Sequence, residues 1–154
     1  MQLTKNFWLN EFVKSQAAIR KNIDNRPTGE VIASLRLLCE NILQPLRDHY
    51  RKAVTINSGY RCPELNKLIG GNVSSQHMLG EAADIEIPSV CTYDLALYIS
   101  KNYKFDQLIL EHYIIGDVNS GWVHVSYTKY KLRNQILTKL HNGREYLDGL
   151  IISS

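Results

Sequence analysis

The sequence predicts one α+β domain, a small and mainly antiparallel sheet with helices packed on it. The chain has 154 residues, enough to bury a hydrophobic core without support from a metal or a disulfide. With 44% hydrophobic and 21% charged residues, its composition is that of a globular protein. Segments of helical spacing alternate with short β-branched segments, and there is no internal repeat or linker. We therefore expect a single domain over residues 1–154, with a core at about 4–127 and a C-terminal tail at 128–154.

The first third of the chain is expected to be helical. Residues 4–26 carry single aromatic anchors among polar residues, which indicates one or two short helices. Pro27 can open a longer helix of about five turns, because apolar residues follow it at spacings of three and four. These residues are Val31, Ile32, Leu35, Leu38, Ile42, Leu43 and Leu46. We place Pro45 near the end of this helix, where a break is least destabilising.

Short strands are predicted in the middle of the chain. Residues 53–57 are rich in β-branched side chains and lead into Ser-Gly, and residues 83–87 alternate in polarity before Pro88. Residues 63–69 can form a helical turn, and residues 92–101 have the spacing of a helix.

Two further strands are expected at residues 105–113 and 122–127. The turn-rich segment 115–121 joins them, so we predict an antiparallel hairpin. The tail over residues 129–154 is ambiguous, because its apolar residues have helical spacing before Gly143. They are Leu132, Ile136, Leu137 and Leu140.

Composition and charge narrow the possible functions. The net charge of +3 is only mildly basic, and Lys and Arg are scattered among acidic residues, so we do not expect a nucleic-acid partner. Such a charge suits a polyanionic surface such as a bacterial cell wall. The three cysteines are odd in number and lack a metal-binding spacing, which favours synthesis in a reducing compartment.

The N-terminus shows no apolar signal-peptide region, and no run of about 18 apolar residues occurs. We therefore expect a protein that is made in the cytoplasm and does not insert into a membrane. We also expect it to be a monomer. If it acts outside the cytoplasm, another factor must release it.

Three residues can form a metal site. A hydrolytic zinc ion needs three protein ligands from His, Asp or Glu, with one position left open. His77, Asp84 and His124 supply this set from three different segments, and small residues around them leave room for a metal and a substrate. Arg61 follows a predicted strand, where a fixed cation can polarise a carbonyl or hold developing negative charge. The same residues also fit a metal-free core with two structural histidines.

The motifs around these residues resemble those of a known family. The chain contains SGYR at 58–61, SQHMLGEAAD at 75–84 and WVHV at 122–125. They match, in order and separation, the SGYR, SxHxxGxAxD and WxH motifs of the zinc D-alanyl-D-alanine carboxypeptidase family. The resemblance extends over about residues 4–127 and is closest to short members from phages and prophages. That family includes phage endolysins and shares its fold with the hedgehog signalling domain.

The resemblance implies a single zinc peptidase domain of hedgehog/DD-peptidase-like fold. Its one Zn²⁺ ion would be bound by His77, Asp84 and His124. Arg61 would hold the substrate carbonyl or the oxyanion, and Ser75 would line the substrate cleft. Two aromatic residues beside the motifs, Tyr60 and Trp122, either line the cleft and contact substrate or belong to the core.

The sequence departs from better-known members of the family at the catalytic carboxylate. Those members have an acidic residue three positions before the last zinc histidine, where this chain has Gly121. Glu111 and Asp117 can replace it, and we favour Glu111. A hairpin centred between Asp117 and Val118 would place Glu111 directly opposite His124, on one face of the sheet.

Two alternatives to Glu111 remain. Asp117 is better explained as a turn former. His112 is a reserve candidate, although a regular strand would point it to the opposite face from Glu111.

The resemblance, together with these residues, implies a zinc-dependent peptidoglycan peptidase that hydrolyses an amide bond of the stem peptide with zinc-activated water. Its action would resemble that of a D-Ala-D-Ala carboxypeptidase or a phage endolysin. The alternative is a catalytically inactive zinc-binding module of the same fold, acting in cell-wall binding or phage structure. Gly121 is the best support for that alternative.

Overall fold

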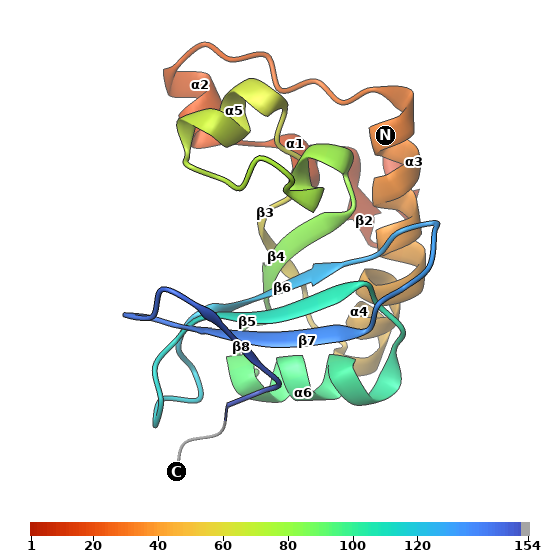
Figure 1. Cartoon of the computed structure of the whole chain (residues 1–154). Helices are drawn as coiled ribbons and strands as arrows, with labels where there is room; N and C mark the ends of the chain where they lie inside the picture. The colour runs from red at the N-terminus through yellow and green to blue at the C-terminus, as the bar shows by residue number, and fades with distance from the viewer. Residues whose placement is uncertain (152–154) are drawn as a thin grey trace.

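The computed structural model describes residues 1–151, and its main feature is a six-stranded sheet with the strand order β3-β4-β6-β5-β7-β8 (Figure 1). All neighbouring strands are antiparallel except β5 and β7, which are parallel. The strands are β3 (Thr55–Ser58), β4 (Ala82–Glu86), β5 (Gln107–Tyr113), β6 (Trp122–Ser126), β7 (Gln135–Leu140) and β8 (Tyr146–Asp148). The predicted α+β fold with a mainly antiparallel sheet is confirmed.

The remaining elements surround this sheet. Strands β1 (Gln2–Thr4) and β2 (Phe7–Trp8) form a separate two-stranded sheet, which the sequence did not indicate. The helical elements are α1 (Leu9–Val13), α2 (Gln16–Arg20), α3 (Gly29–Leu38), the π-helical turn η1 (Cys39–Leu43), α4 (Gln44–Tyr50), α5 (Pro63–Leu68), the 3₁₀ helix η2 (Gln76–Leu79) and α6 (Thr92–Asn102).

The two faces of the main sheet differ in character. Helix α6 packs against strands β5 and β6 and covers one face, whereas α5 and η2 lie beyond the other side of β4 (Figure 1). The covered face is apolar and belongs to the hydrophobic core. Its fully buried residues include Leu108, Leu110, Val123 and Val125. The opposite face is therefore the one that can carry polar groups.

The long helical segment differs from the prediction at Pro45. The helix does not end there but continues through η1 and α4 to Tyr50. In η1 the N–H of Gln44 donates to the carbonyl of Cys39, five residues earlier, so the helix widens immediately before the proline. This widened turn accommodates a ring that would otherwise press against a carbonyl one turn earlier.

The C-terminal tail is extended rather than helical, so its helical spacing was misleading. Strand β7 pairs with β5 in parallel, and β8 returns antiparallel along β7. Thr138, in the middle of β7, is fully buried, and its hydroxyl donates to Gly149 O and accepts from Ile151 N. The tail thus completes the sheet by pairing with a distant strand, which local spacing does not reveal.

Across residues 1–151, no helix combines the length and the apolarity that crossing a membrane requires.

Candidate functional site

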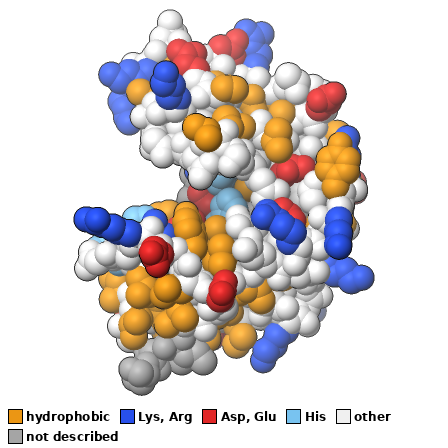
Figure 2. All heavy atoms as spheres, in the orientation of Figure 1, with side chains coloured by type: hydrophobic (Ala, Val, Ile, Leu, Met, Phe, Trp, Pro, Cys, Tyr) orange, Lys and Arg blue, Asp and Glu red, His pale blue; other side chains and the backbone are white. Residues whose placement is uncertain are grey.

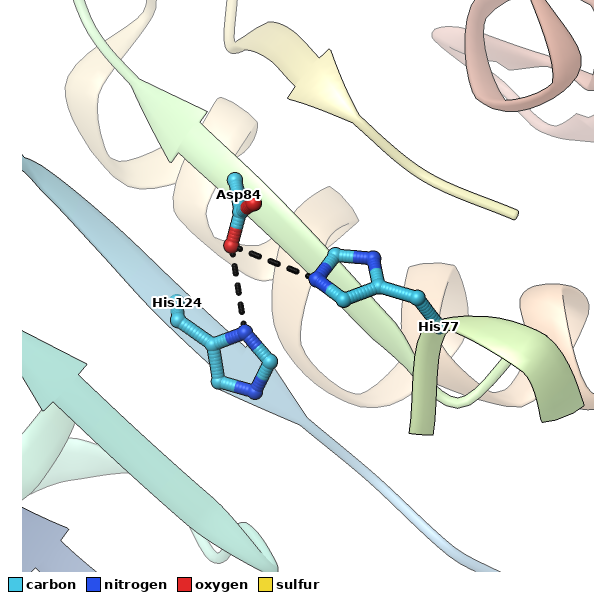
Figure 3. A group of neighbouring side chains, drawn as sticks. All are labelled: His77, Asp84 and His124. Carbon is cyan, nitrogen blue, oxygen red and sulfur yellow. Dashed lines mark hydrogen bonds and ion pairs between the residues drawn. The ribbon is translucent and has the colours of Figure 1, made fainter. Parts of the chain in front are cut away.

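Three elements bring His77, Asp84 and His124 together. Asp84 and His124 are directly opposed in the pairing of β4 with β6, and His77 lies on η2 (Figure 3). Asp84 Oδ1 is 3.4 Å from His77 Nε2 and 3.1 Å from His124 Nδ1. One ligand atom from each residue lies within 4.8 Å of the others, and all three side chains are buried. The geometry can hold one metal ion.

The hydrogen bond at the far side of the His77 ring provides a test of whether a metal fits. His77 Nδ1 is 2.7 Å from the carbonyl oxygen of Gly59, which can only accept, so Nδ1 carries the proton. In a neutral ring, Nε2 then presents a lone pair to the Asp84 carboxylate at 3.4 Å. Two buried acceptors at this distance repel each other unless a cation or a proton lies between them. The donor set therefore fits a divalent metal such as zinc.

Asp84 is anionic in this arrangement. Burial alone would raise its pKa, but hydrogen bonds and positive charge from the imidazoles of His124 and His77, when a proton rather than a metal lies between them and the carboxylate, outweigh burial and hold the pKa of Asp84 well below its usual value. The carboxylate is therefore ready to act as a metal ligand at neutral pH.

Gly59 allows the backbone to approach close enough to position His77. A Cβ atom at this residue would lie 2.6 Å from the carbonyl oxygen of Phe12, in helix α1. The next residue donates its backbone N–H to the same carbonyl at 2.7 Å. Only glycine fits here without a shift of α1, and its own carbonyl then accepts the hydrogen bond from His77 Nδ1.

Ser75 has a structural contact as well as a position in the cleft. Its hydroxyl oxygen accepts a hydrogen bond from the backbone N–H of His77 at 3.2 Å and thereby caps η2. The residue also lines the cleft. Ser75 thus helps to hold the segment that carries His77.

Arg61 lies beside the three ligand residues in a fixed position. Its Nε donates to Ser58 Oγ at 3.0 Å, and its Nη1 donates to Asn66 Oδ1 at 3.2 Å. Its Nη2 is 3.5 Å from Asp84 Oδ2, and 14% of its side chain is exposed. Desolvation by burial lowers the pKa of Arg61, although Asp84 and Glu111 counteract this effect. An arginine stays charged under such a shift, so the site contains a rigid cation.

Glu111 lies on the predicted face, although the predicted register is wrong. The residue opposite His124 is Ile109, and Glu111 is opposite Trp122. This is a shift of two residues, and side chains alternate with a period of two, so Glu111 remains on the same face as His124. Glu111 lines the cleft, and burial raises its pKa despite the opposing influence of His124.

The structure provides a packing reason for Gly121. Its φ is +71°, and a Cβ atom would collide with the backbone carbonyl oxygen of Glu111. An acidic side chain at this position would require the hairpin to open. Gly121, where the family pattern has an acidic residue, is thus explained by its close contact with the backbone of Glu111. Glu111 is the residue that we favour as the catalytic carboxylate.

The two alternatives to Glu111 have different positions. Asp117 Oδ1 accepts from the backbone N–H of Asn119 at 3.1 Å inside the turn, and Asp117 is not among the residues lining the cleft. His112 was expected on the opposite face, but its φ of +50° breaks the regular alternation of β5. Its ring stacks on Trp122 with centroids 4.7 Å apart, and both residues line the cleft.

Tyr60 belongs to the hydrophobic core. It is 7% exposed and is not among the residues that line the cleft. Its predicted contact with substrate therefore gains no support, whereas Trp122 lies where such a contact is possible.

One cleft of about 540 Å³ is bordered by the three ligand residues together with Arg61, Ser75, Glu111, His112 and Trp122. In Figure 2 the hollow opens at the side of the molecule, with histidine and acidic side chains at its bottom. Sequence reasoning missed several parts of its lining, and the most distant in sequence are the residues contributed by the tail. These are Arg133, Leu137 and Tyr146. Nothing in the local sequence marked them, since their place depends on β7 pairing with β5.

A buried His-Asp-His cluster beside a fixed arginine and a carboxylate, all in an open cleft, is the arrangement of a metal-dependent hydrolase. The family model described as Peptidase M15 matches residues 5–126. The chain therefore belongs to the peptidase M15 family, which is a family of zinc-dependent metallopeptidases. No curated protein matches the sequence at a significant level.

Proposed function

We propose that this chain is a zinc-dependent peptidase that hydrolyses an amide bond in the stem peptide of bacterial peptidoglycan. The observation that carries the proposal is the His77 ring, whose Nε2 lone pair faces the Asp84 carboxylate across a gap suited to a cation. Membership of the M15 family supports the same chemistry. The single ion would be bound by His77, Asp84 and His124.

The surrounding side chains have separate roles in this proposal. The bound zinc would supply Lewis-acid polarisation of the scissile carbonyl and a lowered pKa for water in the site. Arg61, held by Ser58 and Asn66, would stabilise negative charge that develops on the carbonyl oxygen. Glu111 would accept a proton from the attacking water and deliver it to the leaving amine. Burial raises the pKa of Glu111. The shift is in the direction that suits a carboxyl group that must both accept a proton and donate it again near neutral pH.

Our proposals for the substrate and for the place where the protein acts rest on the sequence. Mild basicity suits an anionic cell wall, and the motifs around the candidate site resemble those of phage and prophage enzymes. We propose that the protein acts as an endolysin-like monomer, made in the cytoplasm and released to the wall. Among the bonds that the resemblance allows, we favour the terminal D-Ala-D-Ala bond. Cleavage at a D-Ala cross-link or between L-Ala and D-Glu are the alternatives.

The binding-module alternative loses its main support. That support was the missing acidic residue at Gly121, and close packing against Glu111 accounts for the glycine independently of function. The alternative also offers no reason for Glu111 to lie in the cleft beside the ligand cluster.

The proposal is tested by digesting purified peptidoglycan and measuring product masses. The samples are the zinc-loaded protein, the chelated protein, Glu111→Gln and the control Glu40→Gln, which changes an exposed residue that does not line the cleft. We expect loss of a terminal D-Ala or release of stem peptides from the wild type and the control only. Absence of any product from the folded, zinc-loaded protein across several wall types would refute the peptidase proposal.

A further inference from the structure

The cleft has two unlike ends, separated by the ligand cluster. One row of opposed residues crosses four strands on this face, namely Asp84, His124, Ile109 and Leu137. Glu111 and Trp122 lie on one side of this row, together with His112 and Tyr146, and make an aromatic end. Gln107 and Arg133 lie on the other side and make a polar end. Strand geometry separates Gln107 from Glu111 by roughly 13 Å.

Arg133 is held rigidly at the polar end. Asp106 is only 4% exposed. Its carboxylate accepts hydrogen bonds from Arg133 Nε at 3.0 Å and from Arg133 Nη2 at 2.7 Å. It also accepts from the backbone N–H of Arg133 at 3.1 Å. Gln76, the residue before His77, donates its Nε2 to the same carboxylate at 2.9 Å. The guanidinium is therefore tied to the segment that carries a metal ligand.

Part of this guanidinium remains available to a ligand. The Arg133 side chain is 54% exposed, whereas Asp106 lies behind it with 5% of its side chain exposed. Nη1 makes no hydrogen bond within residues 1–151. The free N–H groups of a preorganised guanidinium match the geometry of a carboxylate. No side chain of the cleft lining other than Arg61 offers a comparable fixed cation within residues 1–151.

We propose that Arg133 is a specificity-determining residue that binds a carboxylate of the peptide substrate at the polar end of the cleft. The inference rests on the proposed function in that the ligand is a stem peptide. It goes further because it assigns an orientation, with the anionic part of the peptide at Arg133 and another part at the Trp122–His112 stack. Arg133 lies beyond residues 5–126, the segment that the family model matches, so the selectivity is a property of this chain's tail.

The test compares the binding of three synthetic stem pentapeptides by calorimetry. In one peptide both the D-Glu and the terminal D-Ala carboxylates are free, and in the other two one of them is an amide. The zinc-loaded protein carries Glu111→Gln to prevent turnover, alone or with Arg133→Gln. The matched control adds Arg144→Gln, an exposed arginine of the tail outside the cleft. We expect amidation of one carboxylate to weaken binding about 10-fold or more, the range of a charge-assisted hydrogen bond.

Arg133→Gln should remove that difference, and Arg144→Gln should preserve it. Because Arg133→Gln leaves the buried Asp106 carboxylate without its cationic partner, the double variant Asp106→Asn/Arg133→Gln is measured as well and should also lack the difference. Equal binding of all three peptides by the parent, no binding at all, or a difference that persists without Arg133 would overturn the inference. Selective binding together with a wild type that cleaves no wall would instead reject the peptidase proposal and retain Arg133 as a carboxylate-binding residue.

Discussion

At the scale of single residues, the candidate site depends on two glycines as much as on its polar groups. Gly59 brings its carbonyl to His77 by lying against α1, and Gly121 lies against the backbone of Glu111. Neither glycine takes part in the proposed chemistry. Each one lets two segments approach closely enough to fix a side chain that does, so a Cβ at either position would displace a functional group.

Substitution of Gly121 should therefore be more destabilising than substitution of a glycine that also has a positive φ but has no neighbouring atom in the way of a Cβ. Gly116 provides the matched control, because its φ is +93° but no atom lies within 4 Å of an added Cβ. We expect Gly116→Ala to lower the free energy of unfolding by about 1–2 kcal/mol and Gly121→Ala by about 3 kcal/mol or more. Urea denaturation measures both, and equal losses would contradict the proposed collision with Glu111.

At the scale of elements, Asp106 connects two segments that are far apart in sequence. It joins the β6–β7 connection, through Arg133, to the first residue of the 3₁₀ helix η2, which is Gln76. Its hydrogen bonds with Arg133 outweigh the effect of burial and lower the pKa of Asp106. The tail and the ligand-bearing segment should therefore be coupled in stability.

We predict that Asp106→Asn lowers the free energy of unfolding by about 1–2 kcal/mol at pH 7, since solvent screens the exposed Arg133 partner. A lowered folded-state pKa means that the stabilisation is present above the unfolded value, near 3.8, and is lost as pH falls through the folded pKa. The difference between wild type and variant should thus shrink in strongly acidic buffer. Denaturation curves across pH measure it, and a constant difference would argue against an ionic role.

The elements also show what the sequence could and could not predict. The strands that carry Asp84 and His124, and the helices α5 and α6, were predictable because each has its own spacing and turn residues. The register of the β5–β6 hairpin was wrong by two residues, because a long turn does not define its own centre. The tail stayed ambiguous because Leu132, Ile136, Leu137 and Leu140 fit a helical period, whereas its strands form only through pairing with β5. Arg133 and Tyr146 were missed for the same reason.

At the scale of the whole molecule, a metal ion at the ligand cluster would join η2, β4 and β6. His77, Asp84 and His124 come from these three elements, and the core around them is already continuous. The fold should therefore form without the ion and become more stable with it. This expectation separates a metal centre from a pair of structural histidines.

We predict that zinc raises the thermal unfolding temperature and that a chelator lowers it again. A ligand that binds only the folded state at ~1,000 times its Kd stabilises it by ~4 kcal/mol. Asp84→Asn should abolish most of this response, whereas Asp94→Asn, on α6 and exposed, should retain it. Scanning calorimetry with measured zinc content provides the test. No bound zinc and an unchanged transition in the wild type would favour the metal-free interpretation.

The parallel pairing of β5 with β7 has a consequence for solubility. Strand β5 is central in the sheet only because β7 occupies its second side. A protein shortened to residues 1–127 would retain all three ligand residues, Arg61 and Glu111. It would, however, expose the unpaired N–H and C=O groups of an apolar strand that begins Gln107-Leu108-Ile109-Leu110. Such an open edge pairs readily with another copy of itself. The tail would then protect the molecule from self-association as well as forming one wall of its cleft.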